Sequence, residues 1–342
     1  MTLKILIYGG CHASAFARIL NQYGRSNVTA TTLTNFRLIA KGTPFPYDDL
    51  SNYDLVIFSP IFNKEEYNTD RLEEVLQSKG VNFVKYPWIQ WNGYFPGFRH
   101  KPILDTRIWW NDQLSGEAAN HRDFEKFEEA VLDGDFLSSL AVDNLQQTTT
   151  MLEKNEEKGR VHVPISGWIQ DNFRDRRLLL TPDHAATDLY KFMMSRFEEL
   201  IGPLVERSFY YSTEEVQDGL LTPILPSVAR ALDLKFKSAD FRDPRVASSR
   251  VLSLREYLRI AYESGGVYEL TVSANQTRVK FADTSPVVQK GFKLIATPGT
   301  GEMKAHVCYT LISGGDELGR SRDVFGKEFF VFRGHWDVKR LM

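Results

Sequence analysis

A short run near the N-terminus, Gly9-Gly10-Cys11-His12, holds residue types that suit acyl-transfer chemistry. It lies between an apolar stretch and an amphipathic stretch, which predicts a strand, a tight turn and a helix. The two glycines allow the turn and a close approach of the backbone. A cysteine at a helix N-terminus meets N–H groups and the positive end of the helix dipole, which favour a thiolate and can hold an oxyanion. The run therefore predicts a nucleophile elbow, with Cys11 as nucleophile and Gly9, Gly10 and His12 at the oxyanion turn.

The same run and the second cysteine have other interpretations. Cys11 also suits a small residue buried beneath the helix. A dinucleotide site would need glycine at positions 11 and 14, where the chain has Cys11 and Ser14, so a Rossmann oxidoreductase is discounted. Cys308 alternates within a strand pattern, which indicates packing. With two cysteines and no C-x-x-C spacing, we expect neither a disulfide framework nor a metal site.

His184 is the leading candidate for a general base. It follows a probable strand at 177–180 and precedes a helical pattern at 185–201, so it could point into a cleft at the edge of a sheet. Asp183 could orient the imidazole, or it could cap the helix, as could Thr181. The competing interpretation of His184 is a capping or surface histidine.

The elements that must position these residues alternate along the chain. Residues 3–8, 54–58 and 81–84 are short apolar runs, typical of strands buried in a parallel sheet. Residues 12–23 and 65–79 have the apolar spacing of helices. This alternation predicts an α/β core.

The remaining segments are less regular. Residues 86–110 are rich in tryptophan, proline and glycine and are predicted to form a long ordered loop, whose aromatics Trp88, Trp91, Tyr94 and Phe95 could line an acceptor or adenine site or form loop core. Further helices are predicted at 121–158, 185–201 (ended by Gly202-Pro203), 213–233 and 251–263. A hairpin is predicted over 267–282, with its turn at Asn275-Gln276, and strands at 306–312 and 328–332.

The composition is that of an ordinary globular protein. The 342 residues are 42% hydrophobic and 25% charged, with a net charge of −2, which argues against a general nucleic-acid binder. No run approaches the roughly 18 apolar residues of a membrane span, and the N-terminal apolar stretch is too short for a signal peptide. We therefore expect a cytoplasmic protein without a transmembrane segment.

Four motifs in order resemble the WcbI family of polysaccharide-biosynthesis acyltransferases over residues 3–205. The family opens with a strand followed by Gly-Asn-Cys-Gln, and here the run is Gly9-Gly10-Cys11-His12. The later motifs of this chain are Leu55-Val-Ile-Phe-Ser-Pro60, Tyr86-Pro87 with Gly93-Tyr94-Phe95-Pro96, and Asp183-His184-Ala185-Ala186-Thr187, where the family has His-Pro-Thr. Gly10, His12 and Ala185 depart from the family's Asn, Gln and Pro. Gly10 offers an oxyanion only its backbone N–H.

The resemblance implies an SGNH-hydrolase-like parallel sheet flanked by helices, coenzyme A binding, and transfer of an acetyl group to a sugar of a capsular or other surface polysaccharide. The expected domains are a WcbI-like domain at 1–209 and an appended C-terminal α+β region at 210–342. The phosphates of CoA could meet either of two basic clusters, Arg176 with Arg177 or Arg99 with Lys101. Trp91, Asn92 and Tyr94 are the candidate acceptor-binding residues. The alternatives are an esterase or deacetylase acting on a carbohydrate ester, and a non-catalytic binding protein.

Overall fold

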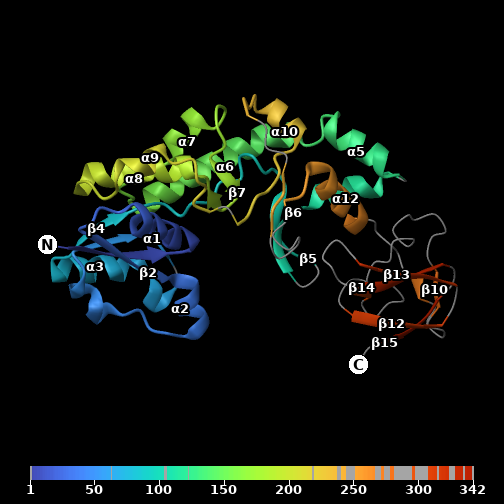
Figure 1. Ribbon diagram of the computed structural model, residues 1–342, viewed down its shortest axis with the longest axis horizontal. Helices are drawn as coiled ribbons and strands as arrows, with labels where there is room; N and C mark the ends of the chain where they lie inside the picture. Colours follow the sequence, from blue (N-terminus) through green and yellow to red (C-terminus); the bar gives the residue numbers. More distant parts are fainter. Residues whose placement is uncertain are drawn as a thin grey trace. The chain divides into compact units, whose positions relative to one another are not determined.

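The computed structural model divides the chain into two compact units (Figure 1). Unit 1 comprises Met1–Phe98 and Leu137–Ala239, and unit 2 comprises Arg99–Phe136 and Asp240–Met342. The described residues are 2–62, 64–103, 106–121, 123–217, 219–236, 240–243, 251–265, 271–272, 278–280, 295–296, 307–313, 316–322, 328–333 and 336–340. The division differs from the predicted boundary at residue 209, because the chain just after that residue still belongs to unit 1.

Unit 1 is built on a four-stranded parallel sheet in the order β2-β1-β3-β4. The strands are β1 (Leu3–Gly9), β2 (Val28–Thr34), β3 (Leu55–Phe58) and β4 (Asn82–Lys85). In β1 the four residues from Ile5 to Tyr8 are at most 1% exposed, as expected for a central strand covered on both faces. The predicted strands β1, β3 and β4 are confirmed. The edge strand β2 was not predicted, because its threonine-rich sequence lacks a continuous apolar run.

Helices cover both faces of this sheet (Figure 1). The helices that precede the aromatic segment are α1 (Cys11–Tyr23), α2 (Asn35–Lys41), η1 (Tyr47–Asn52), η2 (Glu65–Tyr67) and α3 (Thr69–Lys79). On one face, Leu72 and Leu76 of α3 pack with Tyr8 and Phe58 of the sheet. Elsewhere in unit 1, Phe16 of α1 lies 5.1 to 5.2 Å, between ring centroids, from aromatic rings at the end of β4 and on α8.

The rest of unit 1 is mainly helical. Its elements are α6 (Ser138–Gly159), α7 (Ser166–Asn172), β7 (Leu179–Thr181), β8 (His184–Ala185), α8 (Thr187–Ile201), α9 (Arg207–Tyr211) and α10 (Pro226–Ala231). Strands β7 and β8 form a small antiparallel pair just before α8. The helix predicted at 185–201 is confirmed, and Gly202, with a φ of 90°, ends it. The helix predicted over 213–233 is confined to α10.

Unit 2 combines helices with antiparallel strands. The helices are α4 (Asp112–Ala119), α5 (Phe124–Leu132) and α12 (Leu254–Gly265). The strands are β5 (Phe98–Ile103), β6 (Thr106–Asn111), β9 (Thr271–Val272), β10 (Arg278–Lys280), β11 (Ile295–Ala296), β12 (Val307–Ser313), β13 (Asp316–Arg322), β14 (Glu328–Arg333) and β15 (Trp336–Arg340). Five of them form a sheet in the order β11-β12-β15-β10-β9, while β13 pairs with β14 and β5 with β6.

Several predictions for this half of the chain can be compared with these elements. The helix at 251–263 and the strands at 306–312 and 328–332 correspond to α12, β12 and β14. Strands β9 and β10 pair as expected for the predicted hairpin, whose turn lies outside the described residues. The helix predicted over 121–158 is instead two helices, α5 and α6. The predicted loop at 86–110 contains β5 and β6.

Candidate active site

Cys11 is the first residue of α1 and follows directly from the central strand β1. It is a free, partly buried cysteine. The N-cap residue is Gly10, and no side chain caps the helix. The first N–H groups of a helix have no partner within the helix, so this end can receive developing negative charge. The sheet therefore presents a thiol where a helix N-terminus can stabilise an anion.

The two glycines before Cys11 are needed because aromatic side chains lie close to the backbone. A Cβ on Gly9 would stand 2.6 Å from the Tyr86 hydroxyl oxygen. A Cβ on Gly10 would stand 3.3 Å from two carbons of the Trp88 ring. The side chains of Tyr86 and Trp88, which follow β4, therefore pack against the turn into α1.

His184 lies in β8 and is hydrogen-bonded to a carboxylate. Its Nδ1 is 2.9 Å from Asp183 Oδ1 and 3.0 Å from the Thr181 hydroxyl, which itself donates to Asp183 Oδ1 at 2.8 Å. Cys11 also acts on the imidazole, since it is one of the groups that raise the pKa of His184. Residues 11, 183 and 184 thus form a cluster of a thiol, an imidazole and a carboxylate.

The charge of His184 follows from these partners. Burial, the largest single influence, lowers the pKa of His184, but the neighbouring Asp183 and Cys11 outweigh it and raise the pKa to about 9. The imidazole is therefore protonated at neutral pH and can give up a proton as a general acid.

His12 is adjacent to Cys11, but its side chain turns into the core. It is 3% exposed, with Nδ1 2.7 Å from the Tyr190 hydroxyl and Nε2 3.3 Å from the Ile89 carbonyl oxygen. Burial first, and then the nearby His184, lower the pKa of His12 to about 4, so its ring is neutral at neutral pH. In the predicted oxyanion turn, the His12 side chain is therefore engaged elsewhere, and the donors that remain are backbone N–H groups.

A segment that we call the clip, residues 214–217, fastens the start of α8. A Glu215 carboxylate oxygen accepts from the Thr187 N–H at 3.2 Å, and the Thr187 hydroxyl donates to the Glu214 carbonyl at 3.0 Å. The Tyr190 hydroxyl donates to Gln217 Oε1 at 2.6 Å. The prediction that Thr181 or Asp183 caps this helix is wrong, because Glu215 receives its first N–H group.

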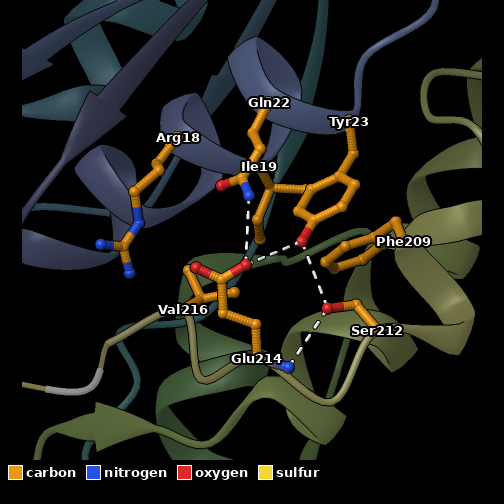
Figure 2. Close-up of a pocket in the computed structure, with 8 residues that line it drawn as sticks. All are labelled: Arg18, Ile19, Gln22, Tyr23, Phe209, Ser212, Glu214 and Val216. Atoms are coloured by element: carbon orange, nitrogen blue, oxygen red, sulfur yellow. Dashed lines mark hydrogen bonds between the residues drawn. The ribbon is translucent and has the colours of Figure 1, made fainter.

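The clip is also bonded to α1 (Figure 2). The carboxylate of Glu214 accepts from the Tyr23 hydroxyl at 3.0 Å and from Gln22 Nε2 at 3.1 Å. Figure 2 shows these groups lining a shallow pocket between α1 and the segment that leads from α9 into the clip. Four of the lining polar side chains are joined by hydrogen bonds, and the clip thereby ties together α1 and α8, the helices that follow Cys11 and His184.

The two basic clusters have different surroundings. Arg177 donates to three backbone carbonyls, of residues 179, 180 and 222, at 2.6 to 2.8 Å. Arg176 is half exposed and lies 3.5 Å from the Asp188 carboxylate. Arg99 belongs to unit 2, where it pairs with Asp112 at 3.0 Å, and Lys101 lies in β5. Arg177 is therefore engaged in holding the backbone, whereas Arg176 keeps an accessible guanidinium.

The predicted acceptor-binding aromatics belong to the core of unit 1. Trp91 is fully buried, with its Nε1 donating to the Thr149 hydroxyl at 3.1 Å. Tyr94 is 1% exposed and its hydroxyl donates to the Phe173 carbonyl at 2.8 Å. Asn92 is partly buried, and its N–H and C=O bond to side chains of α6. The structure thus corrects the prediction for Trp91 and Tyr94, because neither ring has exposed area for a sugar.

Trp88 is the exposed aromatic of this segment. Its side chain is 41% exposed, and its ring covers Gly10, the neighbour of Cys11. Sequence reasoning grouped it with Trp91, Tyr94 and Phe95. No local signal separates these rings, because which of them becomes buried depends on partners far along the chain.

Two further observations bound the kind of site. Among the described residues, no group of three or more His, Cys, Asp or Glu side chains is placed to hold a metal ion. None of the helices in the described part of the chain is both long enough and apolar enough to span a membrane.

Comparison with known proteins gives the chain a family. No match was found among curated proteins. A solved structure described as WcbI, a novel polysaccharide biosynthesis enzyme, in its native form without a disulfide bond between coenzyme A and a cysteine, shares the fold with a TM-score of 0.60. It is 17% identical, and the match covers 78% of this chain and 90% of that one. The family model described as polysaccharide biosynthesis enzyme WcbI matches residues 4–203. With more than half of its length matched, the chain belongs to the WcbI family of polysaccharide biosynthesis enzymes.

Proposed function

We propose that this protein is an acetyl-CoA-dependent O-acetyltransferase that acts on a sugar of a capsular or other surface polysaccharide. The observation that carries the proposal is the cluster of Cys11, at the N-terminus of α1, with the hydrogen-bonded pair His184 and Asp183. Membership of a polysaccharide biosynthesis family supports a carbohydrate acceptor. The solved WcbI structure supports a CoA-type donor, because its description pairs coenzyme A with a cysteine.

The fold and the compartment follow from the same proposal. A nucleophile that follows the first strand of a parallel sheet, with its base just before a late helix, supports an SGNH-hydrolase-like arrangement. Acetyl-CoA is a solute of the cell interior, so we place the reaction in the cytoplasm. Arg176 is the better candidate for a CoA phosphate in the first basic cluster, because its guanidinium is half exposed.

The proposed reaction has two steps. In the first, the Cys11 thiolate attacks the thioester carbonyl, the oxyanion is held by N–H groups at the start of α1, and CoA leaves with a proton from His184. In the second, His184 takes the proton of a sugar hydroxyl as that oxygen attacks the acetyl-Cys11 thioester. The C–S bond breaks, the acetyl ester forms and the Cys11–His184 pair is restored.

His184 suits both steps because of its partners. Its pKa of about 9 keeps a proton available for the departing CoA sulfur at neutral pH. Asp183 at 2.9 Å accepts from Nδ1 and leaves Nε2 to exchange protons with sulfur or oxygen. We expect His184→Gln to lower turnover by roughly 100-fold to 10,000-fold, the range of a positioned acid–base group. Alkylation of Cys11 by iodoacetamide at neutral pH should slow in the same variant.

The test of the nucleophile uses both cysteines. Wild-type protein incubated with acetyl-CoA should gain one acetyl group on the peptide that contains Cys11, as seen by mass spectrometry after rapid acid quenching. Cys11→Ala and Cys11→Ser should lose this adduct and nearly all turnover while still binding CoA. Cys308→Ala, in β12 of unit 2, is the matched control and should retain both.

The possible outcomes separate the proposal from its rivals. Full transfer activity in Cys11→Ala would show direct attack of the sugar on acetyl-CoA, with Cys11 only shaping the pocket. Ester hydrolysis without CoA binding would identify an esterase or deacetylase instead. Absence of both CoA binding and hydrolysis would leave a binding protein with an inert thiol.

A further inference from the structure

The segment that follows β4 contains one ring that is not used by the core. Within residues 86–95, the other aromatic side chains are at most 1% exposed, whereas Trp88 is 41% exposed. In the part of the chain that the structure describes, the Trp88 ring takes part in no aromatic pair. The exposed part of this indole is apolar area that a ligand could cover.

This ring lies beside the turn that carries Cys11. A Cβ on Gly10 would lie 3.3 Å from Trp88 Cη2 and Cζ3, and Cys11 is the next residue. The ring therefore packs against the turn on which the thiol is mounted, while part of its surface remains in solvent. A ligand that approaches this turn from the side of Trp88 meets the indole.

The chemistry around Trp88 suits a neutral, hydroxyl-rich ring. The sequence from residue 86 to residue 98 contains no charged side chain, and Gln90 is exposed beside Trp88. The apolar face of a pyranose can lie on an indole, and an amide can exchange hydrogen bonds with its hydroxyls. The phosphates and adenine of CoA are a pantetheine arm away from the thioester, so they do not meet a ring at the nucleophile.

We propose that Trp88 is the platform that holds the acceptor sugar against Cys11, and so a specificity-determining residue of this site. The inference rests on the proposed function, because it assigns the acceptor side of that reaction. Trp88 acts on the second step, by keeping the attacking hydroxyl near the acetyl-enzyme. The first step, transfer from acetyl-CoA to sulfur, does not need it.

The experiment measures the two steps separately. The variants are Trp88→Phe, Trp88→Ala and, as the matched control, Trp168→Ala, which removes a partly exposed tryptophan on α7 that stacks on Phe192. Acetylation of Cys11 by acetyl-CoA alone reports the first step. Transfer from acetyl-CoA to methyl glucoside, methyl mannoside or methyl galactoside reports both steps.

We expect Trp88→Ala to lower kcat/KM for the accepted glycoside by roughly tenfold, near the upper end for an aromatic contact. Trp88→Phe should lie between the wild type and Trp88→Ala. Acetylation of Cys11 should change by less than about twofold in both variants, because the acceptor sugar takes no part in the first step. An unchanged kcat/KM would overturn the assignment. A fall in Cys11 acetylation equal to the fall in kcat/KM would also overturn it, because Trp88 would then act on the donor side.

A fluorescence titration keeps the inference testable if no acetyl transfer is seen. Adding the three methyl glycosides to wild type should change its tryptophan emission, and this change should be lost in Trp88→Phe and kept in Trp168→Ala. Failure of acetyl transfer together with this pattern would refute the proposed reaction but keep Trp88 as a carbohydrate platform. No glycoside-dependent change at Trp88 would overturn the inference itself.

Discussion

Replacing His12 by Gln should reduce the loss of folding stability that this histidine causes at acid pH. Its ring is 3% exposed, and its two nitrogens contact the Tyr190 hydroxyl and the Ile89 carbonyl. Burial first, and the neighbouring His184 second, lower the pKa of His12 from 6.5 to about 4. A Gln amide could keep both polar contacts, and it does not titrate.

The sign and size follow from proton linkage. Between pH 6.5 and pH 4 the unfolded chain carries a proton on His12 that the folded chain does not, so His12 lowers stability as the pH falls through this window. At about 1.4 kcal/mol per pKa unit, the roughly 1.5 units between pH 6.5 and pH 5 give a penalty of about 2 kcal/mol. The penalty is essentially absent at about pH 7.5.

The assay is urea unfolding, followed by far-UV circular dichroism, of wild type and His12→Gln at about pH 7.5 and about pH 5. His184 acts with the opposite sign, because its raised pKa gives stability that is complete below pH 6.5 and lost as the pH rises through about 9. That contribution is present in both proteins and largely cancels in the comparison. His121→Gln, a partly exposed histidine of unit 2, controls for loss of an imidazole. An equal pH dependence in wild type and His12→Gln would refute the reasoning.

Four further substitutions test the packing around the site and the binding of CoA. Gly9→Ala should lower the free energy of unfolding by about 1–3 kcal/mol, because its Cβ would meet the Tyr86 hydroxyl at 2.6 Å, and thermal unfolding would show it. Glu156→Gln should cost about 1–3 kcal/mol in the same assay, because this buried carboxylate accepts two N–H groups and a hydroxyl at the start of α7; no loss would mean that an amide replaces it fully. Arg177→Ala should destabilise by a similar amount, whereas Arg176→Ala should leave stability nearly unchanged and weaken CoA binding in calorimetry. Equal CoA affinity in Arg176→Ala and wild type would remove that guanidinium from the donor site.

The parts of the site that the sequence predicts well are those defined by neighbouring residues. The strand before Cys11 is a continuous apolar run, and the two glycines after it mark a turn into a helix. His184 was found in the same way, between a short strand and a strongly amphipathic helix. The edge strand β2 was missed because a strand at a sheet edge tolerates the threonines that weaken an apolar pattern.

The parts that could not be predicted depend on contacts between distant residues. Trp91 is fully buried, with Thr149 on α6 accepting from its indole, and nothing near Trp91 in the sequence distinguishes it from Trp88. Arg177 looks like a phosphate ligand until its three carbonyl partners are known. Glu215 sits in a stretch with helical periodicity, but its carboxylate is engaged by the first turn of another helix.

Unit 1 is made of two separate parts of the chain, and this order determines when the site can form during synthesis. The thiol is synthesised early, but the imidazole follows only after residues 99–136, which belong to unit 2, have emerged. The clip comes about thirty residues later still, carrying the carboxylates that join α1 to α8. Domains tend to fold as units during synthesis, from the N-terminal end. A nascent chain paused before residue 214 should therefore carry Cys11 and His184 without the clip that joins α1 to α8, and the rate of Cys11 alkylation would report when the clip docks.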